Sequence, residues 1–63
     1  MTIGERAKKL MKEKNWNQND LAENSGVSIT QINRLINDVG YPSLRTLERV
    51  AKVFEKELVI EFI

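Results

Sequence analysis

The chain has 63 residues, a formal net charge of +1, and neither Cys nor His. This length accommodates one domain, residues 1–63, near the lower limit at which an apolar core offsets the loss of chain entropy. Without Cys or His, a disulfide framework, a thiolate metal site and an imidazole general base are excluded. No apolar run reaches the roughly 18 residues of a membrane span and no signal peptide is recognisable, so a cytoplasmic protein is expected.

Charge is distributed unevenly along the chain. Residues 1–14 contain five basic and two acidic side chains, whereas residues 55–63 contain one basic and three acidic side chains. A basic end of this kind can face phosphate groups even when the net charge is small.

The first helix is predicted over residues 3–14. Thr2 and Glu5 form a T-x-x-E capping box, in which both side chains satisfy backbone donors at a helix start. A similar pair, Asn17 and Asp20, predicts a second helix over residues 18–24.

Two further helices follow. Ser28 is an N-cap residue for a third helix over residues 29–36, and Ser43, after Pro42, is an N-cap residue for a fourth over 44–54. Apolar residues at helical spacing predict the core, together with Trp16: Leu10, Leu21, Ile32, Leu35, Leu47, Val50 and Phe54.

The C-terminal tail, residues 57–63, is rich in Val, Ile and Phe, which favours a strand at 58–63 over a fifth helix packed on the core. A lone strand leaves its backbone donors and acceptors unpaired, so it needs a partner strand. The simplest partner is the same segment of a second copy, paired antiparallel about a twofold axis. The residues expected at this dimer contact are Leu58, Val59, Ile60 and Phe62.

The second and third helices are joined by the tight turn Ser25-Gly26-Val27, in which Gly26 can adopt a positive φ. Helices joined so briefly must cross at a steep angle, as in a helix-turn-helix unit, whose second helix enters the major groove of DNA. The sequence therefore predicts an all-α, four-helix, repressor-like domain with a C-terminal strand.

Four segments in order also resemble the phage repressor and Cro group, or Xre family, over a stretch from about Arg6 to Phe54. They are Trp16-Asn17-Gln18-Asn19-Asp20-Leu21-Ala22, Ser25-Gly26-Val27-Ser28, Ile32-Asn33-Arg34-Leu35 and Pro42-Ser43-Leu44-Arg45-Thr46-Leu47. The resemblance implies a bacterial or phage-infected cell as the setting. It also implies a double-stranded DNA operator, near-palindromic if the protein is a homodimer.

The resemblance implies two sets of site residues. Those expected at base edges are Ile29, Thr30, Asn33 and Arg34, and those expected at phosphates are Gln18, Ser28, Asn37 and Ser43. Arg34 is the leading candidate for specificity because its guanidinium can donate two hydrogen bonds to guanine. Ile29 departs from the polar residue usual in the family and offers only apolar contact with a thymine methyl group.

Plainer interpretations of these residues stay open. Gln18 can be a solvated residue of a first helical turn, and Arg34 a surface side chain paired with Asp38 at the i, i+4 spacing.

The predicted function is that of a dimeric transcriptional repressor. No catalytic constellation, cofactor motif or metal-ligand set is present, so neither an enzyme nor a bound cofactor is expected. The alternatives are an antitoxin that binds a toxin partner through the tail, and an engineered domain of this fold without an operator.

Overall fold

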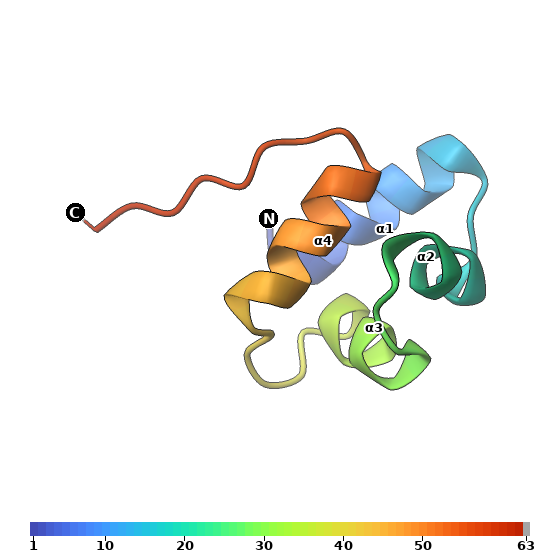
Figure 1. The fold of residues 1–63 in the computed structure, drawn as a ribbon, viewed down its shortest axis with the longest axis horizontal. Coiled ribbons are helices and arrows are strands. Elements are labelled where there is room, and N and C mark those ends of the chain that lie inside the picture. The colour runs from blue at the N-terminus through green and yellow to red at the C-terminus, as the bar shows by residue number, and fades with distance from the viewer. Residues whose placement is uncertain (63) are drawn as a thin grey trace.

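In the computed structural model, which describes residues 1–62, the chain is all-α. Its helices are α1 (Ile3–Lys14), α2 (Gln18–Ser25), α3 (Ile29–Ile36) and α4 (Leu44–Val53). The predicted helix bounds are confirmed, except that α2 is one residue longer and α4 one residue shorter than expected. Figure 1 shows α4 crossing in front of α1, with α2 and α3 to one side and below.

The helices begin at the residues that the sequence indicated. Thr2 and Asn17 each accept a hydrogen bond from the backbone of the third helical residue, and both capping boxes are complete. Ser28 and Ser43 cap α3 and α4 in the same way, through their hydroxyl oxygens. Because each cap satisfies a backbone donor that the helix leaves without a partner, the starts of all these helices are fixed locally.

The core receives side chains from all four of these helices, with Ala7 and Met11 contributed by α1. Leu21 and Ile32 are completely buried, and Leu35, Val50 and Phe54 are buried around them. Trp16 is half-buried and packs against Phe54, their ring centroids 5.7 Å apart, as expected of a core residue. Leu10 and Leu47, also predicted as core residues, are half-buried as well and pack against the buried cluster.

Leu10 and Leu47 are only half-buried because a groove between α1 and α4 is left uncovered. α1 packs mainly against α3, and α2 packs against both α3 and α4. Leu10 and Leu47 therefore line a space of about 260 Å³ that opens to solvent.

The tail forms neither a helix nor a strand over residues 56–62. α4 ends at Val53 with Phe54 as its C-cap, and Glu55 adopts a positive φ of 57°, which redirects the chain. Figure 1 shows the tail running away from the helices as an extended segment. The alternative of a fifth helix is thus wrong for these residues. The expected strand is not formed within one chain because no described segment lies beside the tail to pair with it; its last residue, Ile63, lies outside the described residues.

Asp38 ties the end of α3 to the start of α1. Its carboxylate accepts hydrogen bonds from the Thr2 hydroxyl (2.7 Å) and from the Gly4 backbone N–H (2.9 Å). Gly4 approaches α3 so closely that a Cβ atom there would overlap the carbonyl oxygen of Ile36. The Asp38 carboxylate is therefore occupied at the N-terminus of α1, where the helix dipole favours a negative charge, and not in the pairing with Arg34 considered above.

The hydrogen bond from Thr2 and then that from Gly4 lower the pKa of Asp38; desolvation opposes them to a lesser degree, and the charge of Lys8 adds the smallest lowering effect. A lowered pKa means that the folded chain favours the carboxylate. The Asp38 carboxylate contributes its full stabilisation of the fold above the pKa of an unfolded aspartate, about 4. This contribution is lost as the pH falls through the lower pKa of Asp38 in the folded chain.

We predict that Asp38→Asn is less stable than the wild type near neutral pH, and that this difference shrinks under acid conditions. Thermal unfolding followed by circular dichroism, from about pH 7 down to about pH 2, measures both proteins over the range in which Asp38 titrates. Parallel stability curves for the two proteins would contradict a role for the Asp38 carboxylate.

Candidate nucleic-acid interface

Helix α3 has one buried side and one exposed side. The buried side consists of Ile32, Leu35 and Ile36. The exposed side carries all the residues predicted to contact base edges: Ile29, Thr30, Asn33 and Arg34. These positions follow helical spacing, so the burial of the first set turns the second set outward.

The turn between α2 and α3 is built as the sequence indicated. Gly26 ends α2 with a φ of 73°, and its N–H donates to the carbonyl of Ala22 at 3.0 Å. The next residue, Val27, is buried and anchors the turn on the core. The two helices are thus held at a fixed angle, with α3 protruding at the surface (Figure 1).

Gln18 and Asn33 are joined by a hydrogen bond that sequence reasoning did not foresee. The side-chain nitrogen of Asn33 donates to the Gln18 side-chain oxygen at 3.1 Å. The Gln18 amide group therefore keeps both of its N–H donors for another partner. Within the described residues, the backbone N–H groups of Gln18 and Asn19 also have no acceptor. These donors converge at the positive end of α2, a site suited to an anion.

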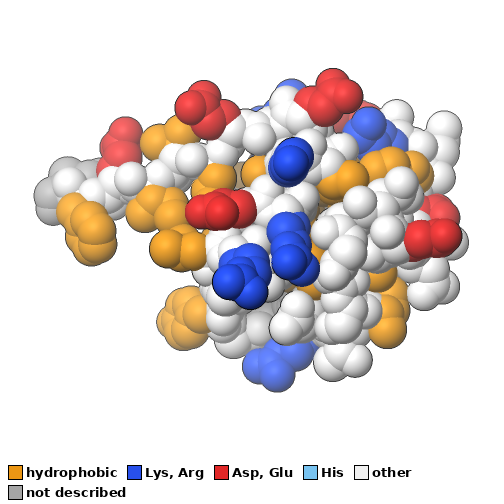
Figure 2. Space-filling view, in the orientation of Figure 1, with side chains coloured by type: hydrophobic (Ala, Val, Ile, Leu, Met, Phe, Trp, Pro, Cys, Tyr) orange, Lys and Arg blue, Asp and Glu red, His pale blue; other side chains and the backbone are white. Residues whose placement is uncertain are grey.

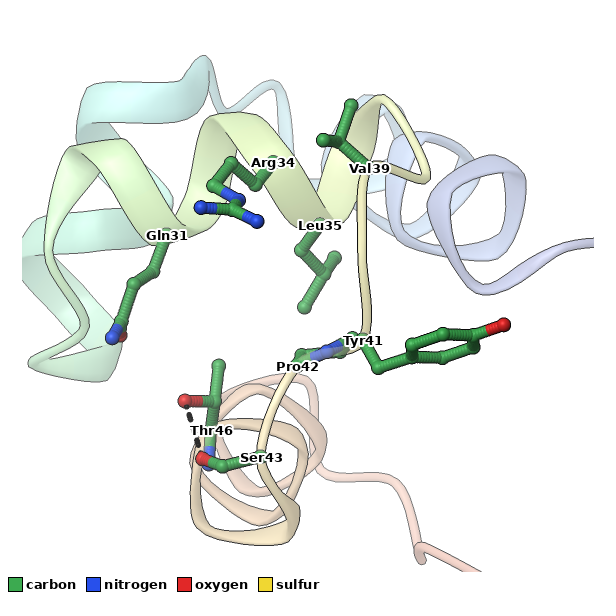
Figure 3. Close-up of a pocket in the computed structure, with 8 residues that line it drawn as sticks. All are labelled: Gln31, Arg34, Leu35, Val39, Tyr41, Pro42, Ser43 and Thr46. Carbon is green, nitrogen blue, oxygen red and sulfur yellow. Dashed lines mark hydrogen bonds between the residues drawn. The ribbon is translucent and has the colours of Figure 1, made fainter.

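Arg34 lies at the mouth of a cavity of about 240 Å³ between α3 and the start of α4. Figure 3 shows Arg34 and Gln31 extending from α3 beside this cavity, with Ser43 and Thr46 across it. The guanidinium also passes close to Gly40, where a Cβ atom would be 2.9 Å from Nη2. The absence of a side chain at this position leaves room for the guanidinium.

The other residues predicted at phosphates are partly occupied. The Ser28 hydroxyl oxygen accepts from a first-turn N–H of α3 and can still donate its proton. The Asn37 side chain donates to the Asn33 carbonyl at 2.8 Å, which leaves one amide N–H. Ser43 accepts from the Thr46 N–H and donates to the Thr46 hydroxyl, so its proton is used within the helix cap.

Sequence reasoning missed a basic row on α4. Arg45, Arg49 and Lys52 are exposed, and their spacing of four and three residues places them along one face of the helix. Figure 2 shows basic side chains along α4 on the face turned to the viewer. Arg49 also reaches the carbonyl of Gly26 in the turn, at 3.5 Å. The helical spacing was the signal that could have revealed this row.

Other kinds of site find no support in residues 1–62. These residues contain no group of three or more His, Cys, Asp or Glu side chains placed to hold a metal ion. None of the described helices has the length and apolar character needed to cross a membrane.

The tight turn, the protruding α3 and the donors at the start of α2 define a helix-turn-helix protein. Comparison with protein families agrees, because a model described as helix-turn-helix matches residues 8–60. The chain therefore belongs to the Cro/C1-type (Xre-like) helix-turn-helix family, a family of DNA-binding transcription regulators that are typically not enzymes. The resemblance noted in the sequence is confirmed. No curated protein sequence and no solved structure matches the chain.

We predict that Gly40→Ala displaces the Arg34 guanidinium and thereby weakens discrimination at one base pair of the operator. The new methyl group would occupy the space beside Nη2, and the positive φ of 67° adds a backbone strain of about 1 kcal/mol. Fluorescence anisotropy with the operator and its single-base variants measures the loss.

Gly26→Ala is the matched control. Gly26 also has a positive φ, of 73°, but a Cβ atom there would meet nothing within 4 Å. This variant should lose a similar amount of stability and keep its base discrimination. Equal changes in discrimination for the two variants would refute the positioning of Arg34 by Gly40.

Proposed function

We propose that this protein binds double-stranded DNA sequence-specifically as a dimeric transcriptional repressor, with α3 in the major groove. The observation that carries the proposal is the exposed side of α3, formed by Ile29, Thr30, Asn33 and Arg34. This side faces outward because Ile32, on the opposite side of the helix, is completely buried. A helix fixed in this way presents side chains to base edges without reorganising on binding.

The residues on the exposed side of α3 have different roles in this proposal. Arg34 donates two hydrogen bonds to a guanine, a contact worth about 1–3 kcal/mol of discrimination against other bases. Thr30 contacts a polar base edge or a thymine methyl group. Ile29, which is 44% exposed, supplies an apolar contact with a thymine methyl group. Asn33 contacts bases through its oxygen and through the one amide N–H that is not bonded to Gln18.

The start of α2 holds a phosphate of the DNA backbone. The Gln18 side chain and the first backbone N–H groups of α2 donate to the phosphate oxygens, which positions α3 in the groove without reading sequence. Ser28 and Asn37 add weaker phosphate contacts through the donors that they retain. To donate to a phosphate, the Ser43 hydroxyl must first break its hydrogen bond to the Thr46 hydroxyl, so we expect Ser43 to contribute least.

In this proposal the active protein is a homodimer. The extended tail pairs with the tail of its partner through Leu58, Val59, Ile60 and Phe62, and the twofold axis places two α3 helices on one side of the DNA. The operator is then a near-palindrome with two half-sites.

Selection of bound sites from a random duplex pool tests the proposal, at roughly physiological salt so that binding by charge alone is suppressed. We expect an inverted repeat to be enriched, with a guanine at one position in each half-site. Failure to enrich any sequence would refute sequence-specific binding.

Two substitutions test the assigned roles on the selected operator. Arg34→Ala should relax the preference for the guanine, by about 1–3 kcal/mol at that base pair. Gln18→Ala should weaken binding to all duplexes by a similar factor, because a phosphate contact carries no sequence information. Anisotropy titrations against the operator and its single-base variants separate the two outcomes. Equal losses on all sequences for both variants would contradict these roles.

A second candidate function is that of an antitoxin or another protein-binding module. The observation in its favour is the exposed apolar tail, in which Val59, Ile60 and Phe62 contact little of the chain's own helices. A toxin partner would bind this segment by strand addition. Site selection that yields no motif, from a chain that forms a stable complex with a toxin encoded beside it, would favour this function over the first.

A further inference from the structure

The basic row on α4, formed by Arg45, Arg49 and Lys52, has no role in the proposed recognition of bases and half-site phosphates. All three side chains are exposed, and helical spacing turns them away from Val50 and Phe54, which are buried in the core. Because an α-helix rises by 1.5 Å per residue, the row is about 10 Å long. It is therefore an extended positive surface that needs an explanation of its own.

The row adjoins the helix that is proposed to enter the major groove. Arg49 donates from Nη1 to the carbonyl of Gly26, in the turn that leads into α3, at 3.5 Å. Arg49 and Lys52 also line an open hollow of about 450 Å³, together with Asn24 and Ser25 at the C-terminal end of α2. The basic row is thus continuous with the surface around the N-terminal end of α3.

Side chains of this hollow keep donors for an external acceptor. A guanidinium carries several N–H donors, and only Nη1 of Arg49 forms a hydrogen bond within residues 1–62. The Asn24 amide donates one N–H to the Asp20 carbonyl at 2.8 Å and keeps the other. Together with the Lys52 ammonium group, these donors suit oxyanions at the surface.

The chemistry of the row favours nucleic acid over a protein partner. A protein interface depends on apolar or aromatic side chains that are buried at its centre, but the apolar residue that lines the hollow, Val53, is already half-buried by its own chain. Phosphate contacts of Arg and Lys need no apolar anchor, because the release of counterions favours binding. A row of three cations therefore fits a row of phosphates.

The row and the exposed side of α3 face different directions. Figure 1 shows α3 at the lower edge of the molecule, whereas the basic side chains along α4 lie on the face turned to the viewer in Figure 2. A straight duplex in contact with α3 would therefore not follow the row along its length.

We propose that the basic row binds phosphates of the duplex beyond the half-site, on the side of the turn between α2 and α3, and that the DNA bends toward the protein to reach it. The extra phosphate contacts offset the cost of bending. This inference rests on the proposed function and extends the DNA-binding surface to a helix outside the helix-turn-helix unit.

Glu48 moderates the charge of the row. This exposed residue lies three positions after Arg45 and four before Lys52, so it is a neighbour of both on the helix surface. Its carboxylate repels phosphates and competes with them for these cations. Removing the charge of Glu48 should therefore strengthen the contact with flanking DNA.

Duplexes of two lengths test the proposal. One contains the selected operator alone, and the other extends it by about 10 base pairs, one helical turn, on each side. We expect the wild type to bind the longer duplex about tenfold more tightly, and its slope of log affinity against log salt concentration to be steeper by about 2 on that duplex, since each phosphate contact contributes ~0.9.

A pair of double variants separates the row from a general effect of duplex length. Arg45→Ala/Lys52→Ala keeps Arg49 and its contact with the turn, so it should fold normally, as circular dichroism can establish, and lose most of the gain in affinity with length. Lys9→Ala/Lys12→Ala removes the same charge from exposed positions of α1 and should keep the gain. Glu48→Gln should increase it. Equal gains for the two double variants would overturn the proposal.

Energy transfer between dyes at the two ends of the longer duplex tests the bend. Binding of the wild type should bring the ends closer together, and binding of Arg45→Ala/Lys52→Ala should do so to a smaller extent. An end-to-end distance that is the same for the two complexes would contradict bending by the row.

The failure of this inference can be told apart from the failure of the proposed function. If the wild type selects a motif but binds both duplexes equally, the row contact is wrong and the base recognition stands. If no motif is selected, the same measurement on arbitrary duplexes of the two lengths still tests the row, because phosphate contacts carry no sequence information. A gain with length that depends on Arg45 and Lys52 would then support the row while the base recognition is wrong.

Discussion

The burial of Leu21 and Ile32 in one apolar core, where α2 packs against α3, is the contact on which the rest of the structure depends. Both side chains are completely buried, one from α3 and one from α2. Burying a side chain of this size stabilises a protein by about 1.5–3 kcal/mol, a large part of the stability available to a chain of this length. The contact fixes the crossing of the two helices, and with it the direction in which the exposed side of α3 points. The surface that we propose for DNA binding is therefore a consequence of an apolar contact behind it.

A second constraint acts at the other end of α3. Asp38 joins this end to the start of α1 by two hydrogen bonds, and the close approach of Gly4 allows the two segments to meet. The loop that follows Asp38 is then placed so that Gly40 lies beside Arg34. The position of a side chain proposed to read DNA is thus linked to the first residues of the chain, 30 or more positions away in the sequence.

The helices and their caps could be predicted from the sequence because they depend on local chemistry. Thr2, Asn17, Ser28 and Ser43 each cap the helix that they were expected to cap. The contacts of Asp38 could not be predicted, since they join segments that are distant in the sequence and no periodicity reports them. For the same reason the half-burial of Leu10 and Leu47 was not foreseen, because helical spacing indicates which side of a helix is apolar but not whether another element covers it.

The hydrogen bond between Gln18 and Asn33 has a consequence for how binding preference can evolve. A residue that contacts only bases can be replaced to suit a new operator while the contacts with the DNA phosphates are kept. Asn33 is not independent in this way, because its side chain also orients the Gln18 amide. In the proposed complex, any replacement at Asn33 alters a base contact and a phosphate contact together, whereas Ile29 and Thr30 have no side-chain hydrogen bond within the described residues. Under the proposed function, new specificities are therefore reached most easily through the first turn of α3, and the position of Asn33 is expected to change late and together with Gln18.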